Sequence, residues 1–478
     1  MPIPGQSFTI NENGVGVVEP ATTIPLFMGY SSGGAANVLK TYSSIPDLIA
    51  GEGQGPAVED AAFDLANSGG PIRFMKTATS VAGSNSAVVN TGGGPNVTVA
   101  GTPNDDYEVV VRVRLGGALG AGQFDYSLDN GVTFSEILTI PAGGTYAIPL
   151  TGLTLTFAAG TYILSATYTF TSTAPMWNST DLGNAFTALI ASSTDWDFAV
   201  LSGRHATASA AATLAAALQT QLTTMANAFR YKRAMMDAGD EASAAVITAF
   251  ASVVTNRVLY SYRSAVLPSA KPFPGWGFPK GRLLKAFAQK AHAGLISTDL
   301  ARVKSGPIPG AISIEHDEQK TEVLDAQKIS TARTIPGLQG FFITNGRLKS
   351  AAGSDFQYWQ HGRIMDVACR TVYLEQAKWL SAGVRTNANG TIDERDAQAI
   401  EAVVTAALNA QLKQPTNAEG TPGHVSALQY TINRLNNFQA TGIVLSELAI
   451  QPLGYIKRFT TTLGFVAGFP QPAVPAAA

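Results

Sequence analysis

Gly55-Pro-Ala-Val-Glu-Asp-Ala-Ala-Phe-Asp-Leu-Ala-Asn-Ser-Gly-Gly-Pro-Ile-Arg-Phe-Met-Lys76 is the stretch that decides the fold. Pro56 suits the first turn of a helix, and Ser68-Gly-Gly-Pro71 joins a C-cap glycine to a proline that stops the helix. Residues 72–76 then have the composition of a strand, and so does Thr22-Thr-Ile-Pro-Leu-Phe-Met-Gly-Tyr30 before the helix. Strands linked through a helix by short loops predict a β-α-β unit with parallel strands.

The same alternation resumes after residue 181. Strands are expected at 196–201, 231–237 and 258–262, and helices at 181–190, 207–229, 242–255 and 281–293. Asp181 is expected to cap the first of these helices. Alternating strands and helices predict a sheet that is covered by helices on both faces.

Between these two α/β segments, residues 81–175 have a different pattern. Strand-like runs follow one another, separated by Gly, Asn and Pro, and no run has helical spacing. Asp129-Asn-Gly131 has the composition of a hairpin turn. Six or seven short strands at this spacing predict an inserted β-sandwich or barrel.

The last third of the chain is expected to contain three helices and three strands. The helices are predicted at 360–382, 394–412 and 424–435, with a further strand before them at 340–345. Residues 442–450 and 454–465 are predicted to pair as antiparallel strands. In the second of these, Tyr455 and Lys457 alternate with Ile456 and Arg458, which is typical of a strand. A terminal strand can also pair with another copy, and we expect it to begin at home and to end, past about Leu463, in a neighbour.

The expected fold class is α/β (α+β) and multidomain. A core of mixed sheet flanked by helices would carry an inserted all-β domain and extended N- and C-terminal arms. The expected division is 1–20, an N-terminal arm; 21–80, the first part of the α/β core; 81–175, the inserted β-sandwich or barrel-like domain; 176–340, the second part of the core; 341–453, a C-terminal α/β subdomain; and 454–478, a C-terminal strand and arm.

Composition narrows the class of protein. Only 14% of residues are charged and the net charge is -2, so no basic field attracts nucleic acid. Sparse charge suits a protein whose surface is covered by partners, and it suits a large Ala-rich enzyme equally well. Cys369 is the single cysteine, which excludes an internal disulfide, and we interpret it as a buried structural thiol. The N-terminus is unlike a secretory signal, and no apolar run is predicted to insert into a membrane.

Several common motifs of nucleotide and metal binding are missing from the sequence. It contains no GxxxxGK[ST], HExxH or CxxC motif, and its five histidines are scattered. No catalytic, cofactor-binding or metal-binding residue is therefore predicted, and no cofactor. The acidic run Glu315-His-Asp-Glu318 suggests acid–base work, but a solvated or intersubunit charge cluster is the simpler interpretation.

One segment resembles a calcium loop. Asn387, Asn389 and Asp396 fall at positions 3, 5 and 12, but position 1 is Arg385, a cation that would repel Ca²⁺. An Asn-Gly turn followed by a helix with Asp393 as its N-cap explains the same residues.

Taken in order, four segments resemble contractile tail sheath proteins of bacteriophages. Residues 22–29 resemble the first core strand of that family, and residues 55–76 resemble its next helix and strand. Residues 122–135 resemble a hairpin of β-domains inserted in phage tail proteins, and residues 454–465 resemble the C-terminal strand and arm of the sheath. Gly306-Pro-Ile-Pro-Gly-Ala311 departs from the family, since it replaces a longer aromatic loop.

The resemblance implies a structural protein without enzymatic activity. Many copies would stack as rings around a tail tube, and their terminal arms would complete the sheets of neighbours. The implied partners are further copies, the tube protein, and the baseplate and tail terminator proteins. The implied location is the virion tail, after assembly in the host cytoplasm. The candidate arm residues are Phe8, Ile10, Val15, Val17, Tyr455, Ile456, Lys457, Arg458, Phe459, Leu463 and Phe465.

Two other hypotheses remain. Another phage structural protein, such as a baseplate subunit, or the sheath of a related contractile injection particle, would share much of this pattern. A hydrolase with an appended β-sandwich is the remote alternative, and it would need a site of convergent polar residues.

Overall fold

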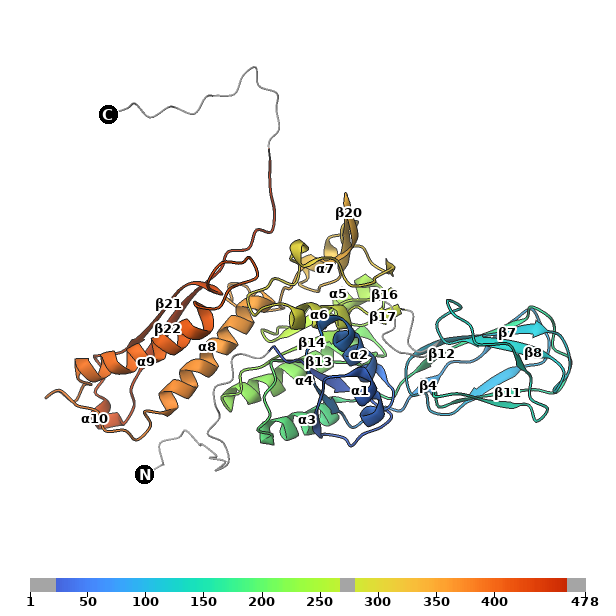
Figure 1. Ribbon diagram of the computed structural model, residues 1–478, viewed down its shortest axis with the longest axis horizontal. Coiled ribbons are helices and arrows are strands. Elements are labelled where there is room, and N and C mark those ends of the chain that lie inside the picture. Colours follow the sequence, from blue (N-terminus) through green and yellow to red (C-terminus); the bar gives the residue numbers. More distant parts are fainter. Residues whose placement is uncertain (1–22, 267–279, 462–478) are drawn as a thin grey trace, which may run out of the picture.

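The computed structural model describes residues 23–266 and 280–461, and the molecule is elongated with three parts in a row (Figure 1). A central α/β core lies between the inserted β-domain on one side and a subdomain of long helices on the other. The candidate residues Phe8, Ile10, Val15, Val17, Leu463 and Phe465 lie outside the described residues.

The core is built on a six-stranded sheet in the order β15-β14-β13-β1-β3-β2. All neighbours in it are parallel except β2, which runs antiparallel to β3 at one edge. The predicted parallel pairing of the strand at 22–30 with that at 72–76 is therefore confirmed. The strands are β1 (Leu26–Gly29), β2 (Leu39–Tyr42), β3 (Ile72–Lys76), β13 (Phe198–Leu201), β14 (Arg233–Asp237) and β15 (Val258–Ser261).

Both faces of this sheet are covered by helices, as the alternating pattern predicted. Leu26 and Met28 point into the hydrophobic core under α3, α4 and α5, while Phe27 between them points into the core under α1, α2 and α6. Because successive side chains of a strand point to opposite faces of the sheet, β1 contributes residues to two separate hydrophobic cores. The helices are α1 (Ile45–Glu52), α2 (Pro56–Ser68), α3 (Ser179–Ala191), α4 (Ala208–Asn227), α5 (Ser243–Phe250) and α6 (Leu284–Ala293).

Asp181 lies inside the helix that it was predicted to cap. The helix begins earlier, with Asn178 as its N-cap, and Asp181 at the third position returns a bond to the Asn178 backbone. The two side chains form a capping box, so Asp181 stabilises the same helix end from inside.

The inserted domain is a two-sheet β-sandwich with its own core. One sheet has the order β10-β11-β6; the other has β4-β12-β7-β8-β9, with β5 also paired to β12. The Asp129-Asn-Gly131 turn forms, with positive φ at Asn130 and Gly131, although a longer loop joins β8 to β9. The strands are β4 (Ser84–Asn85), β5 (Val89–Thr91), β6 (Val97–Ala100), β7 (Tyr107–Leu115), β8 (Gln123–Ser127), β9 (Leu138–Thr139), β10 (Thr145–Ile148), β11 (Leu153–Phe157) and β12 (Thr167–Thr173).

The sandwich leaves and re-enters the core at one point. Val81 and Met176 form an antiparallel bridge there, with N–H···O distances of 3.0 and 2.9 Å in the two directions. The two ends of the insertion are therefore adjacent, and the sandwich projects away from the core (Figure 1).

Smaller elements connect the core to the last subdomain. A three-stranded sheet has the order β17-β16-β18, and β19 and β20 form a hairpin that contains the strand predicted at 340–345. The elements are β16 (Ser264–Val266), β17 (Lys280–Arg282), the 3₁₀ turn η1 (Val303–Ser305), β18 (Ser313–Ile314), α7 (Val323–Ala326), β19 (Ala332–Ile335) and β20 (Leu338–Ile343).

The last subdomain consists of two long helices under a two-stranded sheet. It contains α8 (Trp359–Ala377), α9 (Glu394–Leu412), β21 (Val425–Ile432), α10 (Phe438–Thr441) and β22 (Ser446–Pro452). The helix α8 belongs to two hydrophobic cores: Trp359 at its start packs under the central sheet, whereas Ile364 and Val367 pack with α9.

Buried ion pairs fasten α8 to the central sheet. Asp366 forms an ion pair with Arg233 at 2.6 Å and accepts from Arg257 at 2.9 Å, and Arg363 donates to Asp197 at 2.5 Å. Because Arg233, Arg363, Asp197 and Asp366 are all buried, breaking one partner of a pair leaves an uncompensated charge.

Candidate assembly interface

The two-stranded sheet of β21 and β22 is an open platform. β22 pairs antiparallel with β21, with Leu448 opposite Tyr430 and Ile450 opposite Leu428. Among the described strands, neither has a partner on its outer edge. Unpaired strand edges carry free N–H and C=O groups, which makes this sheet a template for a further strand.

Two predictions about this region are wrong. Residues 424–435 were expected to form a helix, but β21 occupies them. Residues 442–450 were expected to pair with 454–465; instead β22 pairs with β21, and residues 453–461 form neither helix nor strand. β21 already occupies the edge of β22 with which the beginning of the arm was expected to pair, so the arm cannot pair there.

One face of the platform lies on α8 and α9. Tyr430 and Ile432 are buried there, and Leu448 and Ile450 are partly buried in the same core. Arg434, just after β21, donates to Glu401 at 2.8 Å and to Glu394 at 3.1 Å, which raises the pKa of the guanidinium. The strand pair is thus held to α9 by packing and by a charged clamp.

The base of the C-terminal arm is docked on its own subunit by two side chains. The Tyr455 hydroxyl donates to the Ser297 carbonyl at 2.7 Å, and its ring lies 5.7 Å from that of His361. Burial raises the pKa of Tyr455, and burial lowers that of His361. The Tyr455 hydroxyl therefore stays protonated near neutral pH and can donate.

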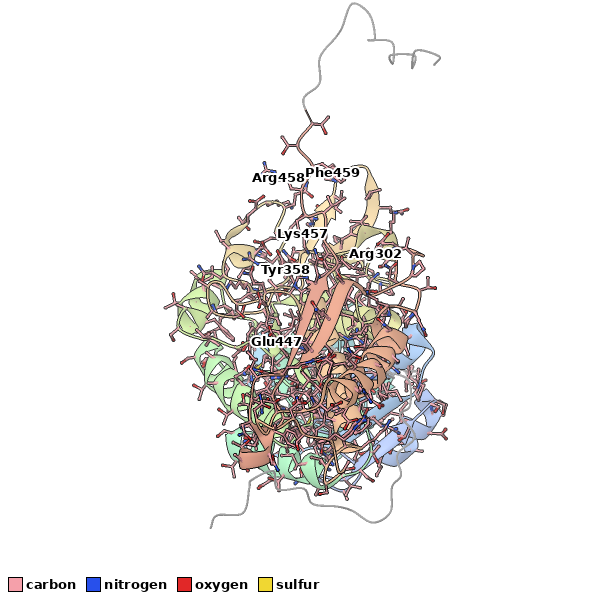
Figure 2. The ribbon with its side chains drawn as sticks, turned by 90° about the vertical axis from the view of Figure 1, so that its left-hand side faces the viewer. Arg302, Tyr358, Glu447, Lys457, Arg458 and Phe459 are labelled. Carbon is pink, nitrogen blue, oxygen red and sulfur yellow. The ribbon has the colours of Figure 1, made fainter. Side chains whose placement is uncertain are left out.

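Lys457 is the second anchor. Its ammonium pairs with the Asp299 carboxylate, donates to Asn345 Oδ1 at 3.1 Å and lies 4.7 Å from the Tyr358 ring centroid. Asp299 is buried; its carboxylate also accepts from Gln360 Nε2 at 3.2 Å and from the Ala301 N–H at 2.9 Å. Figure 2 shows Lys457 beside Tyr358 at the point where the arm leaves the body.

The other large side chains near the base of the arm face outward. Ile456 is 74% exposed and Phe459 is 80% exposed, and Arg458 is exposed without a partner among the described residues. In Figure 2, Arg458 and Phe459 lie beyond Lys457 and away from the body. Tyr455 and Lys457 therefore share a docked face, but Phe459, which the predicted alternation places with them, is exposed instead. Sequence reasoning missed Ser297 and Asp299, because they lie 158 residues from the side chains that they hold.

The calcium-like loop is a helix cap. Asp393 is the N-cap of α9 and accepts from the Arg395 N–H, while Asp396 forms an ion pair with Arg385 at 2.5 Å. The Asp396 carboxylate, which a bound Ca²⁺ would need, is thus already paired with Arg385. The interpretation of this segment as a turn followed by a helix cap is confirmed. No group of three acidic, His or Cys side chains suited to a metal occurs in residues 23–266 and 280–461.

The acidic run at 315–318 also has a structural role. Glu318 is buried and accepts from the N–H groups of Leu324 and Asp325, both at 3.0 Å, at the start of α7. Burial raises its pKa, and His316 lies 3.2 Å away. The expectation of a solvated or intersubunit cluster is wrong for Glu318, because that side chain is occupied inside the chain.

Open parallel sheets of this kind usually bind ligands in a crevice at one end of the strands, and in this protein side chains and loops of the chain itself occupy that crevice. The parallel strands have, in chain order, the arrangement 2-1-3-4-5, which places the usual ligand crevice between β1 and β13 at their carboxyl ends. There Trp177, 2% exposed, donates to the Ser202 carbonyl at 3.0 Å. A Cβ on Gly29 would lie 2.5 Å from the Ser202 oxygen, so the two bordering loops are in contact.

The fold is that of contractile sheath proteins. The chain superposes on a chain of the contracted helical sheath of the anti-feeding prophage with a TM-score of 0.51 and 12% identity, covering 98% of this chain and 100% of that chain. It also superposes on a chain of the contracted sheath complex of PVC, an extracellular contractile injection system, with a TM-score of 0.51, 10% identity and 98% of both chains covered. A chain from the baseplate structure of the anti-feeding prophage gives a TM-score of 0.51 and 12% identity, with 97% and 99% covered.

Residues 4–347 match the family described as DUF2586, N-terminal domain, which is more than half of the chain, and the protein belongs to that family. No curated protein matches the sequence. Within the described residues, no helix combines the length and apolar character that crossing a membrane requires.

Proposed function

We propose that this protein is the subunit of a contractile sheath. Many copies assemble as a helix around a tail tube, and the sheath contracts to drive the tube through the host cell envelope. The observation that carries the proposal is the open-edged sheet β21–β22 in the same subunit as an arm whose free face points away from the body. The fold shared with chains of two contracted sheaths supports it.

The physical logic of such an assembly is strand addition. An arm from one copy lies along the open edge of the platform on another, and backbone hydrogen bonds join the two subunits. Such bonds persist while rigid bodies rotate about the linkers. The energy of contraction is held in the assembled, metastable lattice, so no nucleotide site is required.

The remaining parts take their roles from this arrangement. Residues 21–80 and 176–340 form the body of the subunit, residues 341–453 carry the platform, and 1–20 and 454–478 are the arms. The insertion at 81–175 lies on the outer surface. The tube, baseplate and tail terminator proteins are the other partners, and the assembled particle is a virion tail built in the host cytoplasm.

Removing the arm tests the proposal directly. A chain that ends at Leu453 loses the side-chain anchors of Tyr455 and Lys457 but, within the described residues 454–461, no regular element. We expect it to be soluble and folded, with a melting temperature within about 4 °C of the full chain, and unable to polymerise. Negative-stain electron microscopy should show striated tubes for the full chain and none for the truncated chain. Long tubes from the truncated chain would refute the role of the arm.

Two alternatives give different images or assays. A baseplate component would form rings or small closed particles, where a sheath forms long tubes. A hydrolase would need a cleft lined by polar residues, and the crevice at the carboxyl ends of β1 and β13 is closed by the contact of Gly29 with Ser202.

A further inference from the structure

The charges available for contacts between copies are few on both the arm and the platform. The segment 454–478 contains two charged residues, Lys457 and Arg458. Lys457 is already paired with Asp299 of its own subunit, so Arg458 is the one cation of the arm that is left for a neighbour. On the platform, Glu447 is the single charged residue of β21 and β22.

Glu447 is placed to meet an added strand. It is exposed near the start of β22, the strand whose outer edge has no partner among the described strands. No hydrogen bond or ion pair involves its side chain in the described part of the chain. Figure 2 shows Glu447 on the platform, well below Arg458 on the arm, so the two do not meet within one copy.

We propose that Arg458 of one copy forms an ion pair with Glu447 on β22 of a second copy, and that this pair sets the register of the arm on the platform. The inference rests on the proposed sheath function. Its basis is charge complementarity: the arm offers one unpaired cation, and the platform offers one unpaired anion. Opposite charges facing each other across strands favour one register, since backbone bonds alone tolerate a slip of two residues.

The role of Lys457 in this arrangement is to fix where the arm starts. Its contacts with Asp299, Asn345 and Tyr358 hold the residue directly before Arg458 against the body. The reach of Arg458 toward the neighbour is therefore defined by the subunit surface. A freely moving arm would present the same charge at many positions.

A charge exchange tests the pair. Arg458→Glu and Glu447→Arg each place like charges together, and we expect the critical concentration for tube formation to rise by about tenfold or more. The double variant restores opposite charges and is expected to form tubes near the concentration of the unchanged protein. Arg395→Glu, an exposed site on α9, changes net charge as Arg458→Glu does and is the control. Circular dichroism verifies that each variant is folded.

The outcomes separate this inference from the proposed function. If the unchanged protein forms tubes but either single variant does so equally well, or the double variant is not rescued, the ion pair is wrong and the sheath function stands. If the unchanged protein forms no tubes, the proposed function fails first.

Cross-linking gives a second measurement that does not depend on charge. In a Cys369→Ala background, one copy carries Arg458→Cys and a differently tagged copy carries Glu447→Cys, so each chain has one thiol. Mixed tubes under oxidation are expected to yield disulfide-linked heterodimers containing both tags. Tubes that yield no such heterodimer would overturn the proposed contact.

Discussion

Adjacent residues of the arm have opposite roles, which is visible at the scale of single side chains. Lys457 is docked at home and Arg458 is free, although in the sequence both are cations of the same alternating run. The exposed Phe459 breaks the predicted alternation, whereas the shared side of Tyr455 and Lys457 was predictable from local pattern. Which face is docked was not, because the decision rests on Asp299, a buried carboxylate that lies far away in the sequence. The local sequence pattern indicates which side chains share a face, whereas long-range contacts decide which face is docked on the body.

Lys232, a buried lysine of the core, makes stability depend on pH. Burial lowers the pKa of Lys232 to about 8, beside the Asp195 carboxylate and the Trp196 carbonyl. Between about pH 8 and 10.5 the unfolded chain keeps a proton that the folded chain has lost, so the free energy of unfolding rises with pH across this window. We expect a contribution of up to about 1.4 kcal/mol per pH unit.

Lys232→Met is expected to remove this contribution. The measurement is urea unfolding at pH 8.5 and 10, with the difference between the two pH values compared between the unchanged protein and the variant. Lys320→Met, at an exposed side chain, controls for the loss of a lysine as such. An identical pH difference in the unchanged protein and Lys232→Met would contradict the prediction.

At the scale of elements, the core and the platform differ in how far they could be predicted. The β-α-β unit has consistent signals: Pro at the helix start, Gly in the left-handed conformation at its end, and buried strands on both sides. The segment 424–435 has conflicting signals. A register shift between Val425 and Ala427 breaks the period of two, so Val425, Leu428 and Ile432 fall at spacings of three and four that imitate a helix. The pairing with β22 overrides this local pattern.

Helix α8 contains a glycine whose replacement is expected to be costly. A Cβ on Gly362 would lie about 2 Å from the Arg233 guanidinium, which is buried and held by Asp366 and the Asn256 carbonyl. Gly362→Ala therefore displaces a buried ion pair, and we expect it to lower the free energy of unfolding of the core by about 3 kcal/mol or more. Urea denaturation followed by circular dichroism measures the loss.

Gly183→Ala in α3 is the matched control. Its new methyl group would have its nearest neighbour at 3.6 Å, in ordinary contact, so we expect a gain of about 0.5–1 kcal/mol from helix propensity. Equal effects of the two substitutions would show that the fit around Gly362 is unimportant.

At the scale of the whole molecule, the insertion was predictable and its independence can be tested. A run of strands without helical spacing, between two α/β segments, indicated a separate β-domain, and the structure shows a sandwich with its own hydrophobic core. The sequence could not reveal that the ends of the insertion meet, since the bridge between Val81 and Met176 joins residues that are distant in the chain.

Excision of the insertion is expected to leave an assembling protein. Residues 82–175 are replaced by Asn-Gly, a dipeptide suited to a tight turn between Val81 and Met176. We expect a soluble, folded core that forms tubes of smaller outer diameter, as measured by electron microscopy. Expression of the excised sandwich by itself is the companion experiment, and a folded sandwich beside an aggregated core would show that the core depends on the insertion.

Helix α8 gives the subunit a lever. Its 19 residues form a rod about 28 Å long, clamped at one end by Trp359 and the Arg233–Asp366 pair and carrying the platform along the rest. A pull on the platform thus becomes a torque at the clamp. The fixed end of the helix lies under the central sheet, so a small tilt there displaces the far end of α8 by a larger distance. The stiffness of the buried contacts around Trp359 and Asp366 therefore limits how far a force from a neighbouring copy can move the core.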